Sequence, residues 1–506
     1  MEQVEASGEE LRQQRQRVIG AAAAVTLLVL LPVLAARHLP LMDAPAHEAR
    51  LAFLRAAIFS GQPSAFYALG SFFLPDIAFD AIGTMLVPLA GPEGAARIFF
   101  ALTLALQLWG ILVLNRVATG RWSAVPLAAG LVLYSLTVIY GFLSFNFGLA
   151  LVPWALALRL RAGTGPRGFL VGAASGLVLV FCHVYAFAVY AVMAAGFALP
   201  RHGFAWRSLA GRLTEFAPPA ALLLFMAQGI AGEVRFGDPY IPLKVSALAR
   251  SFTSGSVTGD AAFIAGACLL LALIAAFARR RIVPSFVPGL LILSGLFLCM
   301  PFAVGFATYV DCRLPAALAL LALAGLDVRI RHSRTAAALI AAVALAFVIK
   351  QVALTALWRS FDPLIDQAMT AFAALPTGSV VMTAECHTNI VFDVYGQYRA
   401  RQPAMPHWAA FAAFDGTRFD PGGWAIRGQQ PIIVKPAYRQ AYTLQQSFPD
   451  KTCALQGLQA QLQYIRELAH RPGASPYYLF AIRVPVTPRG VAQVARGRDF
   501  ALYTVR

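Results

Sequence analysis

Apolar runs of about 20 residues recur along the first two thirds of the chain, separated by short segments that carry arginine. Each run is about long enough to cross the ~30 Å hydrocarbon core of a bilayer as a helix. Backbone groups in lipid must be paired within their own segment, which favours helices over loops. Twelve runs are found, at about 18–36, 73–90, 95–115, 123–141, 145–160, 168–183, 184–199, 213–231, 260–278, 284–303, 312–327 and 335–352.

The first run, 18–36, is followed by no A-x-A-like cleavage motif, and further runs come after it. We therefore expect a retained helix rather than a removed signal peptide.

The arginines between the runs predict the topology, because cytoplasmic loops carry an excess of Lys and Arg. If all twelve runs cross, three basic loops fall outside, which breaks this rule repeatedly. If 73–90 does not cross, seventeen arginines in six clusters lie inside, and the outside hairpins near 142–145, 183 and 304–308 carry none. These clusters are Arg12, Arg15 and Arg17; Arg116 and Arg121; Arg159, Arg161 and Arg167; Arg201, Arg207 and Arg212; Arg279, Arg280 and Arg281; and Arg329, Arg331 and Arg334. The sequence thus predicts eleven spans with the N-terminus inside.

The segment 73–90 has a second reason not to cross. Asp76 and Asp80 are four positions apart, which would place both on one face of a helix. A carboxylate at the bilayer centre costs roughly 2.5–3.5 kcal/mol on insertion scales, whereas an interfacial or re-entrant helix avoids this cost. The first outer loop then runs over 37–94, and its segment 46–60 has the apolar spacing of a helix on the membrane surface.

From about residue 358, the long apolar runs end and the residue pattern becomes that of a soluble domain. SVVMTA (379–384), QPIIV (430–434), YYLFAIRV (477–484) and FALYTVR (500–506) predict strands, and 455–471 predicts an amphipathic helix. The sequence therefore predicts an α-helical polytopic membrane protein of about 11 transmembrane helices, with a membrane domain over 1–357 and an outer soluble α/β domain over 358–506.

Composition excludes other classes of protein. The 506 residues are 59% hydrophobic and only 13% charged, against about 25% charged in soluble proteins. The net charge of +17 comes from loop arginines and not from a basic stripe with interleaved aromatics, so no nucleic-acid partner is expected. The six cysteines form no C-x-x-C and no zinc spacing. In an oxidising outer space, Cys386 and Cys453 are equally consistent with a disulfide and with two buried thiols.

Candidate chemistry begins directly after the first run. LPLMDAPAHEAR (39–50) holds Asp43, His47, Glu48 and Arg50. A carboxylate at Asp43 is suited to act as a base or to position an acceptor hydroxyl. The alternative is a solvated helix N-terminus with Asp43 near its cap.

Further polar residues fall at the same predicted membrane face. Asn146 lies at the outer end of the run 145–160, and His183 lies in the hairpin between two runs. Either residue could line a site, or could be a satisfied structural residue. The spacing of His47, His183 and the carboxylates gives no support for a divalent metal site, so no metal ligand is assigned.

Asp311 and Arg313 stand at the outer start of the run 312–327. An arginine at headgroup level pairs bidentately with a phosphate, although an Asp–Arg interfacial anchor explains the same pair. The outer segment 232–259 adds Lys244 as a second cation, in a loop that either covers a site or simply connects two spans.

The layout of the whole chain resembles the GT-C superfamily of membrane glycosyltransferases, on short motifs. An acidic residue, Asp43, follows the first span, and GPEGAAR (91–97) is similar to the family's entry to its second span. The D-x-P-x-H at 43–47 and the ending GRDFALYTVR (497–506) are similar to an uncharacterised bacterial group of such proteins. Many GT-C enzymes carry adjacent acidic residues, whereas Asp43 stands alone.

This resemblance implies a glycosyltransferase of the bacterial inner membrane, with a cytoplasmic N-terminus and a periplasmic C-terminal domain. It would take sugar from a polyprenyl-phosphate donor and pass it to a glycan, lipid or protein acceptor, with no cofactor assigned. Asp43 and His47 would be catalytic. The substrate-binding residues would be Glu48, Asn146, His183, Lys244, Asp311 and Arg313. The alternatives are a lipid or polysaccharide transporter or flippase, and a non-catalytic envelope assembly protein. Transporters usually show repeats and midplane charges, and neither is clear here.

The predicted topology is tested with fusions. A reporter that is active only in the cytoplasm should be inactive when fused after Arg506, and active when fused after Arg116. Activity at both positions would refute the eleven-span topology.

Overall fold

The structure is a computed structural model that describes residues 8–202, 213–226, 233–238, 240–249, 251, 265, 278–305, 307–330, 333–386, 407–447, 455–471 and 473–505. The described chain is mostly helical and divides into two compact units. Unit 1 comprises residues 1–34, 100–138 and 142–355, and unit 2 comprises 35–99, 139–141 and 356–506.

Among the described residues, four helices are long and apolar enough to cross a bilayer, so the chain is an integral membrane protein. They are α1 (Gly8–Ala35), α3 (Ala78–Thr119), α5 (Leu143–Ala162) and, over Ala337–Ala373, α14 (Ser333–Ala373). The other α-helices are α2 (Ala44–Phe59), α4 (Leu136–Ile139), α6 (Pro166–Cys182), α7 (Val184–His202), α9 (Ala217–Met226), α10 (Tyr240–Ala249), α12 (Phe286–Cys299), α13 (Arg313–Ala324), α16 (Pro436–Ser447) and α17 (Leu455–Ala469). The part of the chain that the structure describes also contains the 3₁₀ helices η1 (Val125–Leu131), η2 (Thr214–Phe216) and η4 (Trp408–Ala413).

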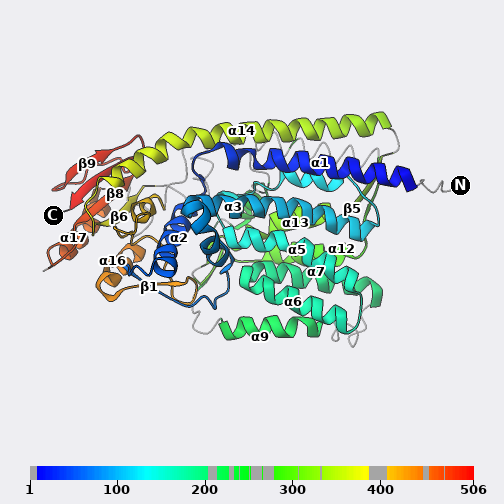
Figure 1. Ribbon diagram of the computed structural model, residues 1–506, viewed down its shortest axis with the longest axis horizontal. Helices are drawn as coiled ribbons and strands as arrows, with labels where there is room; N and C mark the ends of the chain where they lie inside the picture. The colour runs from blue at the N-terminus through cyan, green and yellow to red at the C-terminus, as the bar shows by residue number, and fades with distance from the viewer. Residues whose placement is uncertain are drawn as a thin grey trace. The chain divides into compact units, whose positions relative to one another are not determined.

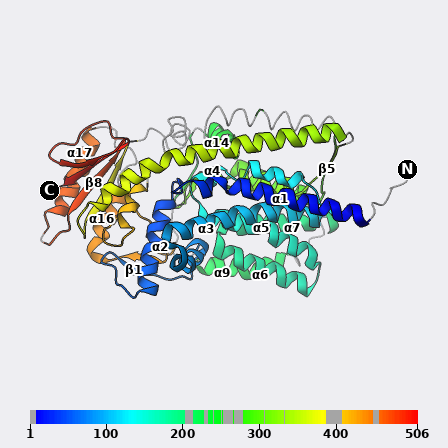
Figure 2. The same ribbon diagram turned by 45° about the horizontal axis from the view of Figure 1, so that its top comes forward.

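Unit 1 is a bundle of apolar helices. α5, α6 and α7 pack against one another, and α12 packs against both α7 and α13 (Figures 1 and 2). Small residues permit close approach: a Cβ on Gly196 of α7 would lie 2.5 Å from the backbone nitrogen of Gly289 on α12. Glycine at such contacts is typical of helix packing in membranes, where backbones approach closely. Most of the run 260–278 lies outside the described residues.

The run 123–141 is not the continuous helix that the sequence predicts. It consists of η1, the single turn α4 and irregular backbone, so the prediction of a regular span there was wrong. Non-helical backbone at membrane depth is tolerated where protein buries it and pairs its polar groups. Tyr134 is fully buried, and side chains from elsewhere in unit 1 supply donors: Lys350 Nζ to the Leu131 carbonyl and Asn146 Nδ2 to the Thr137 carbonyl.

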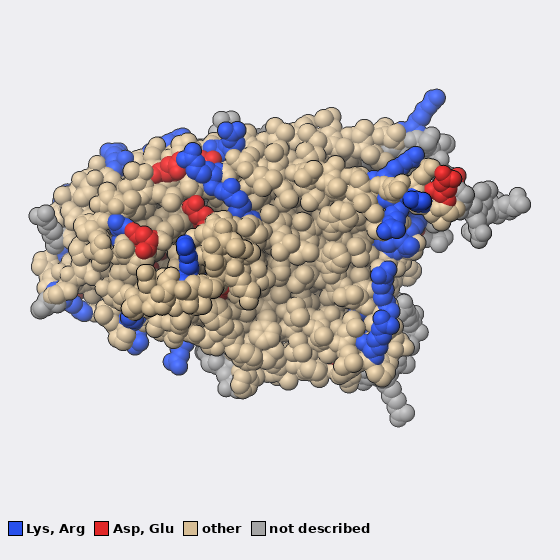
Figure 3. All heavy atoms as spheres, viewed as in Figure 1, with Lys and Arg blue, Asp and Glu red and all other residues tan. Residues whose placement is uncertain are grey.

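Several of the basic segments of unit 1 lie close to one another. Lys and Arg side chains gather at the end of the bundle where α1 begins (Figure 3). Gln14 donates to the Trp122 carbonyl, Arg15 lies over the Trp122 ring, and Arg121 pairs with Asp327. Strands β3 (Ala278–Ile282) and β5 (Leu326–Ile330) pair antiparallel, which joins two more of these segments. Unit 1 also holds the two-stranded pair of β2 (Val234–Arg235) and β4 (Ala303–Val304).

Unit 2 contains a four-stranded sheet in the order β6-β8-β10-β9. The strands are β6 (Val380–Glu385), β8 (Tyr477–Ile482), β10 (Phe500–Val505) and β9 (Ala492–Arg496). Every residue of β8 is buried, because the end of α14 packs Phe372 on Phe480 and α17 covers β10. A strand covered on both faces reads as a continuous apolar run, as this one does. The predicted strands and the amphipathic helix are present, while β9 and α16 were not predicted.

The segment 37–94, which the sequence predicts as the first outer loop, belongs to the same compact unit as the C-terminal part. Strand β1 (Tyr67–Leu69) pairs antiparallel with β7 (Ile432–Val434). Lys435 also donates from its backbone nitrogen to the Phe66 carbonyl and from Nζ to the Ser64 carbonyl. Backbone pairing over this distance in sequence has no local signal, so the sequence could not predict it.

Helix α2 forms where the sequence predicts it, but the prediction for the two aspartates was wrong. Asp76 precedes α3 and has a φ of 63°, so it shares no helical face with Asp80. Asp80 is compensated by Arg50 at 2.6 Å, with both side chains buried. α3 is kinked at Gly91, whose φ of 71° and ψ of 174° are not helical. Cys386 is disulfide-bonded, and its predicted partner Cys453 lies outside the described residues.

Asn146 is expected to stabilise unit 1 by pairing the broken segment. Asn146→Ala leaves the buried Thr137 carbonyl without this donor, so thermal stability should fall by about 1–3 kcal/mol. The measurement is thermal unfolding in detergent, with Ser294→Ala as the control, because Ser294 only donates to Leu290 within its own helix. Equal small losses in both variants would contradict this role.

Candidate functional site

Asp43 occupies the N-cap position of α2 and is 1% exposed. Its side chain makes no capping hydrogen bond, so the local capping role is not what the structure shows. One carboxylate oxygen, Oδ1, lies 3.6 Å from Nε2 of His407, which is beyond a hydrogen bond. Burial lowers the pKa of His407 to about 4, so this ring is neutral at pH 7.

Three residues of the irregular segment, 139–141, fold against α2 within unit 2. Met42 and Asp43 donate their backbone N–H groups to the carbonyls of Ile139 and Tyr140, at 3.0 and 3.1 Å. Gly141 follows with a φ of 79°, and a Cβ there would lie 3.0 Å from the Asp43 nitrogen. This close approach in a left-handed conformation explains why the position is glycine.

His47 lies one helical turn beyond Asp43. Arg50 Nη2 approaches Nδ1 of His47 at 2.6 Å, while Arg50 Nε donates to Asp80. Burial lowers the pKa of His47 well below its usual value, and the charge of Arg50 lowers it further. A hydrogen bond with the Gly141 backbone acts in the opposite direction. The neutral ring thus accepts from Arg50, and it holds the segment 139–141 against α2.

Glu48 is 3% exposed. Burial raises its pKa well above the usual value; the charge of Glu93 adds to this increase and that of Arg97 opposes it. The neighbouring His38 lies 3.2 Å from Glu93 and 2.9 Å from Asp366. Glu48 is therefore a buried carboxyl group of unit 2 that interacts with the half-exposed carboxylate of Glu93.

In unit 1, Arg313 begins α13 and is 7% exposed. Its guanidinium carbon lies 4.5 Å from the ring centre of Phe142, 5.0 Å from that of Tyr185 and 5.8 Å from that of Phe145. Nε and Nη1 have no hydrogen-bond partner among the described residues. Burying a charge is costly unless a partner compensates it. Stacking on three rings offsets part of that cost and leaves two donors for an anion.

His183 belongs to the same aromatic cluster. It links α6 to α7 in extended conformation, and its ring centre lies 5.2 Å from Phe145 and 5.5 Å from Tyr185. Its Nδ1 accepts from the Tyr185 backbone N–H at 3.1 Å, so Nε2 carries the proton of the neutral ring. The structure thus brings His183 and Arg313 together.

The side-chain amide of Asn146 forms hydrogen bonds within unit 1. Oδ1 accepts from the Thr137 hydroxyl, and Nδ2 donates to the carbonyls of Thr137 and Phe142. Its geometry favours a structural role over contact with a substrate.

Lys244 and Asp311 form a buried ion pair at 2.9 Å. Lys244 also donates to the Met300 carbonyl at 2.6 Å. Asp311 thus pairs with the lysine, and the predicted Asp–Arg anchor with Arg313 is not formed among the described contacts. Since the charge of Lys244 is compensated, Arg313 is the better candidate for an anionic ligand.

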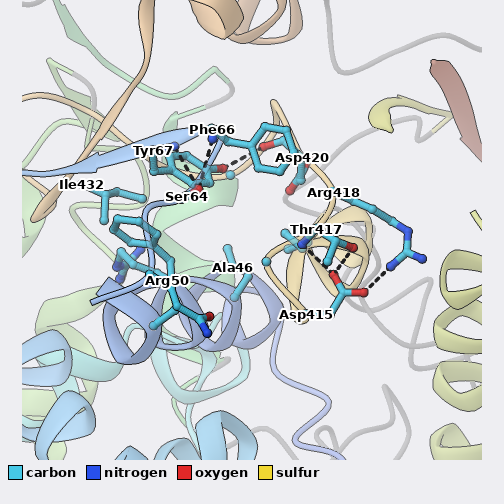
Figure 4. A pocket seen from close by; sticks show the side chains of 18 of the residues that line it. Ala46, Arg50, Ser64, Phe66, Tyr67, Asp415, Thr417, Arg418, Asp420 and Ile432 are labelled. Carbon is cyan, nitrogen blue, oxygen red and sulfur yellow. Dashed lines mark hydrogen bonds and ion pairs between the residues drawn. The ribbon is translucent and has the colours of Figure 1, made fainter. Parts of the chain in front are cut away.

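Unit 2 also holds a cavity of about 200 Å³ that sequence reasoning missed. One wall is the α2 stripe of Ala46, Ala49, Arg50 and Phe53, and Figure 4 shows the loop around Thr417 and Asp420 facing it. Trp424 lines the cavity, and its ring centre lies 4.6 Å from His407 and 5.7 Å from His47. The sequence showed only turn signals at Pro421-Gly422-Gly423; the buried Asp420 before them and Trp424 after them carried no periodic pattern.

Asp420 is 2% exposed. Its Oδ1 accepts from the Gly422 N–H at 2.8 Å, and its Oδ2 has no hydrogen-bond partner in the part of the chain that the structure describes. Burial raises the pKa of Asp420 to about 7, against a small opposing effect of the Gly422 N–H.

Within the described residues, no group of three or more His, Cys, Asp and Glu side chains is placed to hold a metal ion.

Two solved structures are similar to the chain over nearly all of its length. One is ArnT from Cupriavidus metallidurans in the apo state, with a TM-score of 0.49 and 14% identity, covering 96% of this chain and 98% of that one. The other is the arabinofuranosyltransferase AftD from Mycobacteria, as a mutant, with a TM-score of 0.39 and 17% identity, covering 97% of this chain and 41% of that one.

No protein-family model matches the sequence, and no curated protein matches it. Since both TM-scores are below 0.5, the case for the function of this chain rests on its own residues.

The raised pKa of Asp420 predicts a specific pH dependence. Between its ordinary value of 3.8 and the folded value of about 7, the folded state binds more protons than the unfolded state. The free energy of unfolding therefore falls as pH rises through this window, by on the order of 4 kcal/mol at full effect. Asp420→Asn should remove this loss and be more stable than the wild type at pH 8, with a smaller difference at pH 5.

Thermal unfolding of both proteins at the two pH values measures the effect. Glu467→Gln, at an exposed carboxylate of α17, is the control and should show no such difference. A constant offset between Asp420→Asn and the wild type at both pH values would refute the shift.

Proposed function

We propose that the chain is a membrane glycosyltransferase that takes sugar from a polyprenyl-phosphate carrier. The observation that carries the proposal is Arg313: a buried arginine stacked on three aromatic rings, with two donors that no described residue accepts. A guanidinium held in this way suits a phosphate, because its planar fork matches two phosphate oxygens.

The resemblance to GT-C glycosyltransferases supports the same function. It also implies a role for Asp43 at the acceptor. In the reaction, the acceptor hydroxyl oxygen bonds to the anomeric carbon of the sugar while the bond from that carbon to the phosphate oxygen breaks. Asp43 takes the hydroxyl proton, and the polyprenyl phosphate leaves with the electron pair. Arg313 stabilises the negative charge of this leaving group, which is an electrostatic task for a fixed cation.

The remaining candidates take supporting roles in this proposal. His47 positions the backbone of 139–141 beside Asp43, and His183 keeps Nε2 as a donor in the Arg313 cluster. Lys244 and Asp311 fix the start of α13 through their ion pair, and Asn146 holds the broken segment. Glu48 remains a candidate for acceptor binding, as a buried carboxyl group whose pKa is raised by burial.

On this proposal the bilayer is the bacterial inner membrane and the site faces the periplasm. The gathering of arginines at the α1 end of unit 1 supports a cytoplasmic position for that end. The same pattern supports the eleven-span topology with a periplasmic C-terminal domain.

Binding and transfer are tested separately. In nanodiscs, undecaprenyl phosphate should bind Arg313→Ala about tenfold to a hundredfold more weakly than the wild type, since a hydrogen bond to a charged group contributes about 1.5–3 kcal/mol. Undecaprenol, which lacks the phosphate, should not discriminate between them. Arg167→Ala, at an exposed arginine, serves as the matched control.

Asp43→Asn should retain this binding and lose transfer from a panel of undecaprenyl-phosphate sugars to membrane acceptors. Full transfer by Asp43→Asn would remove the base from the mechanism. Undiminished undecaprenyl phosphate binding by Arg313→Ala would remove the donor site, and would favour the transporter or assembly alternatives.

A further inference from the structure

The cavity of unit 2 has the size of a small polar group. Its volume of about 200 Å³ far exceeds the ~30 Å³ that one water occupies in the liquid. It is smaller than the roughly 300–1,000 Å³ typical of sites for drug-sized ligands. One sugar ring or a molecule of similar size therefore suits it.

Two buried polar groups that line the cavity are incompletely paired. Asp420 Oδ2 and Arg50 Nη1 have no hydrogen-bond partner among the residues that the structure describes. Their exposed fractions are 2% and 4%. Native proteins pair almost all such buried atoms, so each one calls for an explanation. Asp420 Oδ2 is an acceptor, and Arg50 Nη1 is a donor.

The two arginines in the cavity wall are paired within the protein. Arg50 is paired with Asp80, and Arg418 with Asp415. An anion would face the carboxyl group of Asp420, and a cation would face Arg50. A neutral molecule with several hydroxyl groups satisfies both atoms, because a hydroxyl both donates and accepts.

Aromatic side chains complete the wall. Phe53 and Tyr67 lie with ring centres 5.5 Å apart, and Phe66 and Trp424 also line the space. The Tyr67 hydroxyl donates to the Asp420 carbonyl at 3.3 Å, which fixes the ring beside the carboxyl group (Figure 4). Such rings cover the apolar C–H face of a sugar while the polar atoms take its hydroxyls.

We infer that this cavity binds one neutral sugar ring, held between Asp420 and Arg50 and stacked on the aromatic wall. The inference rests on the proposed function, because Trp424 lines the cavity and contacts His407 and His47, and His407 is the neighbour of Asp43. The bound ring is then part of the acceptor, and Trp424 and His407 connect it to the proposed base. The substrate class is a glycan or glycolipid with an uncharged sugar near the reacting hydroxyl.

The inference explains why a carboxylate that destabilises the fold stands at this position. A structural aspartate stabilises the protein, so its replacement lowers stability. A ligand-binding aspartate with an unpaired buried oxygen does the opposite, because the ligand supplies the missing hydrogen bond. Stability and binding should therefore change in opposite directions in the same variant.

The experiment measures sugar binding to the full chain in nanodiscs at pH 8, by saturation-transfer NMR and by binding titrations. The probes are methyl glucoside, methyl galactoside and methyl mannoside, with methyl glucuronide and glucosamine as the charged comparisons. At least one neutral glycoside should bind at least tenfold more tightly than either charged sugar. Asp420→Asn keeps the acceptor for Gly422 but places an amide nitrogen where Oδ2 was. It should weaken binding at least tenfold while raising the melting temperature, whereas Glu467→Gln should change neither.

Preferential binding of the charged sugars, or equal binding of the neutral ones by Asp420→Asn and wild type, would overturn the inference. A failure of the proposed function looks different. In that case neutral glycosides bind in an Asp420-dependent way, but undecaprenyl phosphate binding does not depend on Arg313 and no transfer depends on Asp43.

Discussion

The arrangement of unit 2 depends on the contacts of one buried guanidinium, that of Arg50. It joins α2 to the start of α3 through its ion pair with Asp80, and it orients His47 through Nδ1. Arg50 also lines the cavity. His47 in turn holds Gly141, which packs on the backbone of Asp43. Removal of one member of a buried ion pair costs about 3–5 kcal/mol, because the other charge is left uncompensated. The position of the proposed base is thus tied to a charge that never contacts it directly.

The free-energy cost of burying charged side chains is compensated differently at different candidate residues. Lys244 and Asp311 compensate each other and have little left to offer a ligand. Arg313 has aromatic faces in place of a carboxylate, and Asp420 has only a backbone donor. A ligand supplies what is missing in both cases, an anion for the first and hydroxyl groups for the second. Incomplete pairing, more than the presence of charge, distinguishes the candidate binding residues from the structural ones.

Sequence patterns predicted the features that follow from local chemistry. Apolar length predicted α1, α5 and α14, and spacing predicted α2 and α17. They failed over 123–141, where the run is long enough but the backbone is broken, because Asn146 and Lys350 replace helical hydrogen bonds from distant positions. Position at one predicted membrane face gathered Asp43, His183 and Arg313 as candidates. It could not find Asp420 or His407, whose importance comes from burial and from neighbours far away in the chain.

The pairing of β1 with β7 has a consequence for how the chain is made. Tyr67 lies opposite Val434, so the first loop leaves the ribosome hundreds of residues before its partner strand. At roughly 5–20 residues per second, this delay lasts tens of seconds. During that interval β1 is an unpaired strand edge, and both its own Leu69 and the nearby Phe73 are exposed even in the finished fold. An unpaired apolar edge is a template for wrong partners, so the loop is open to mispairing until the residues of β7 emerge.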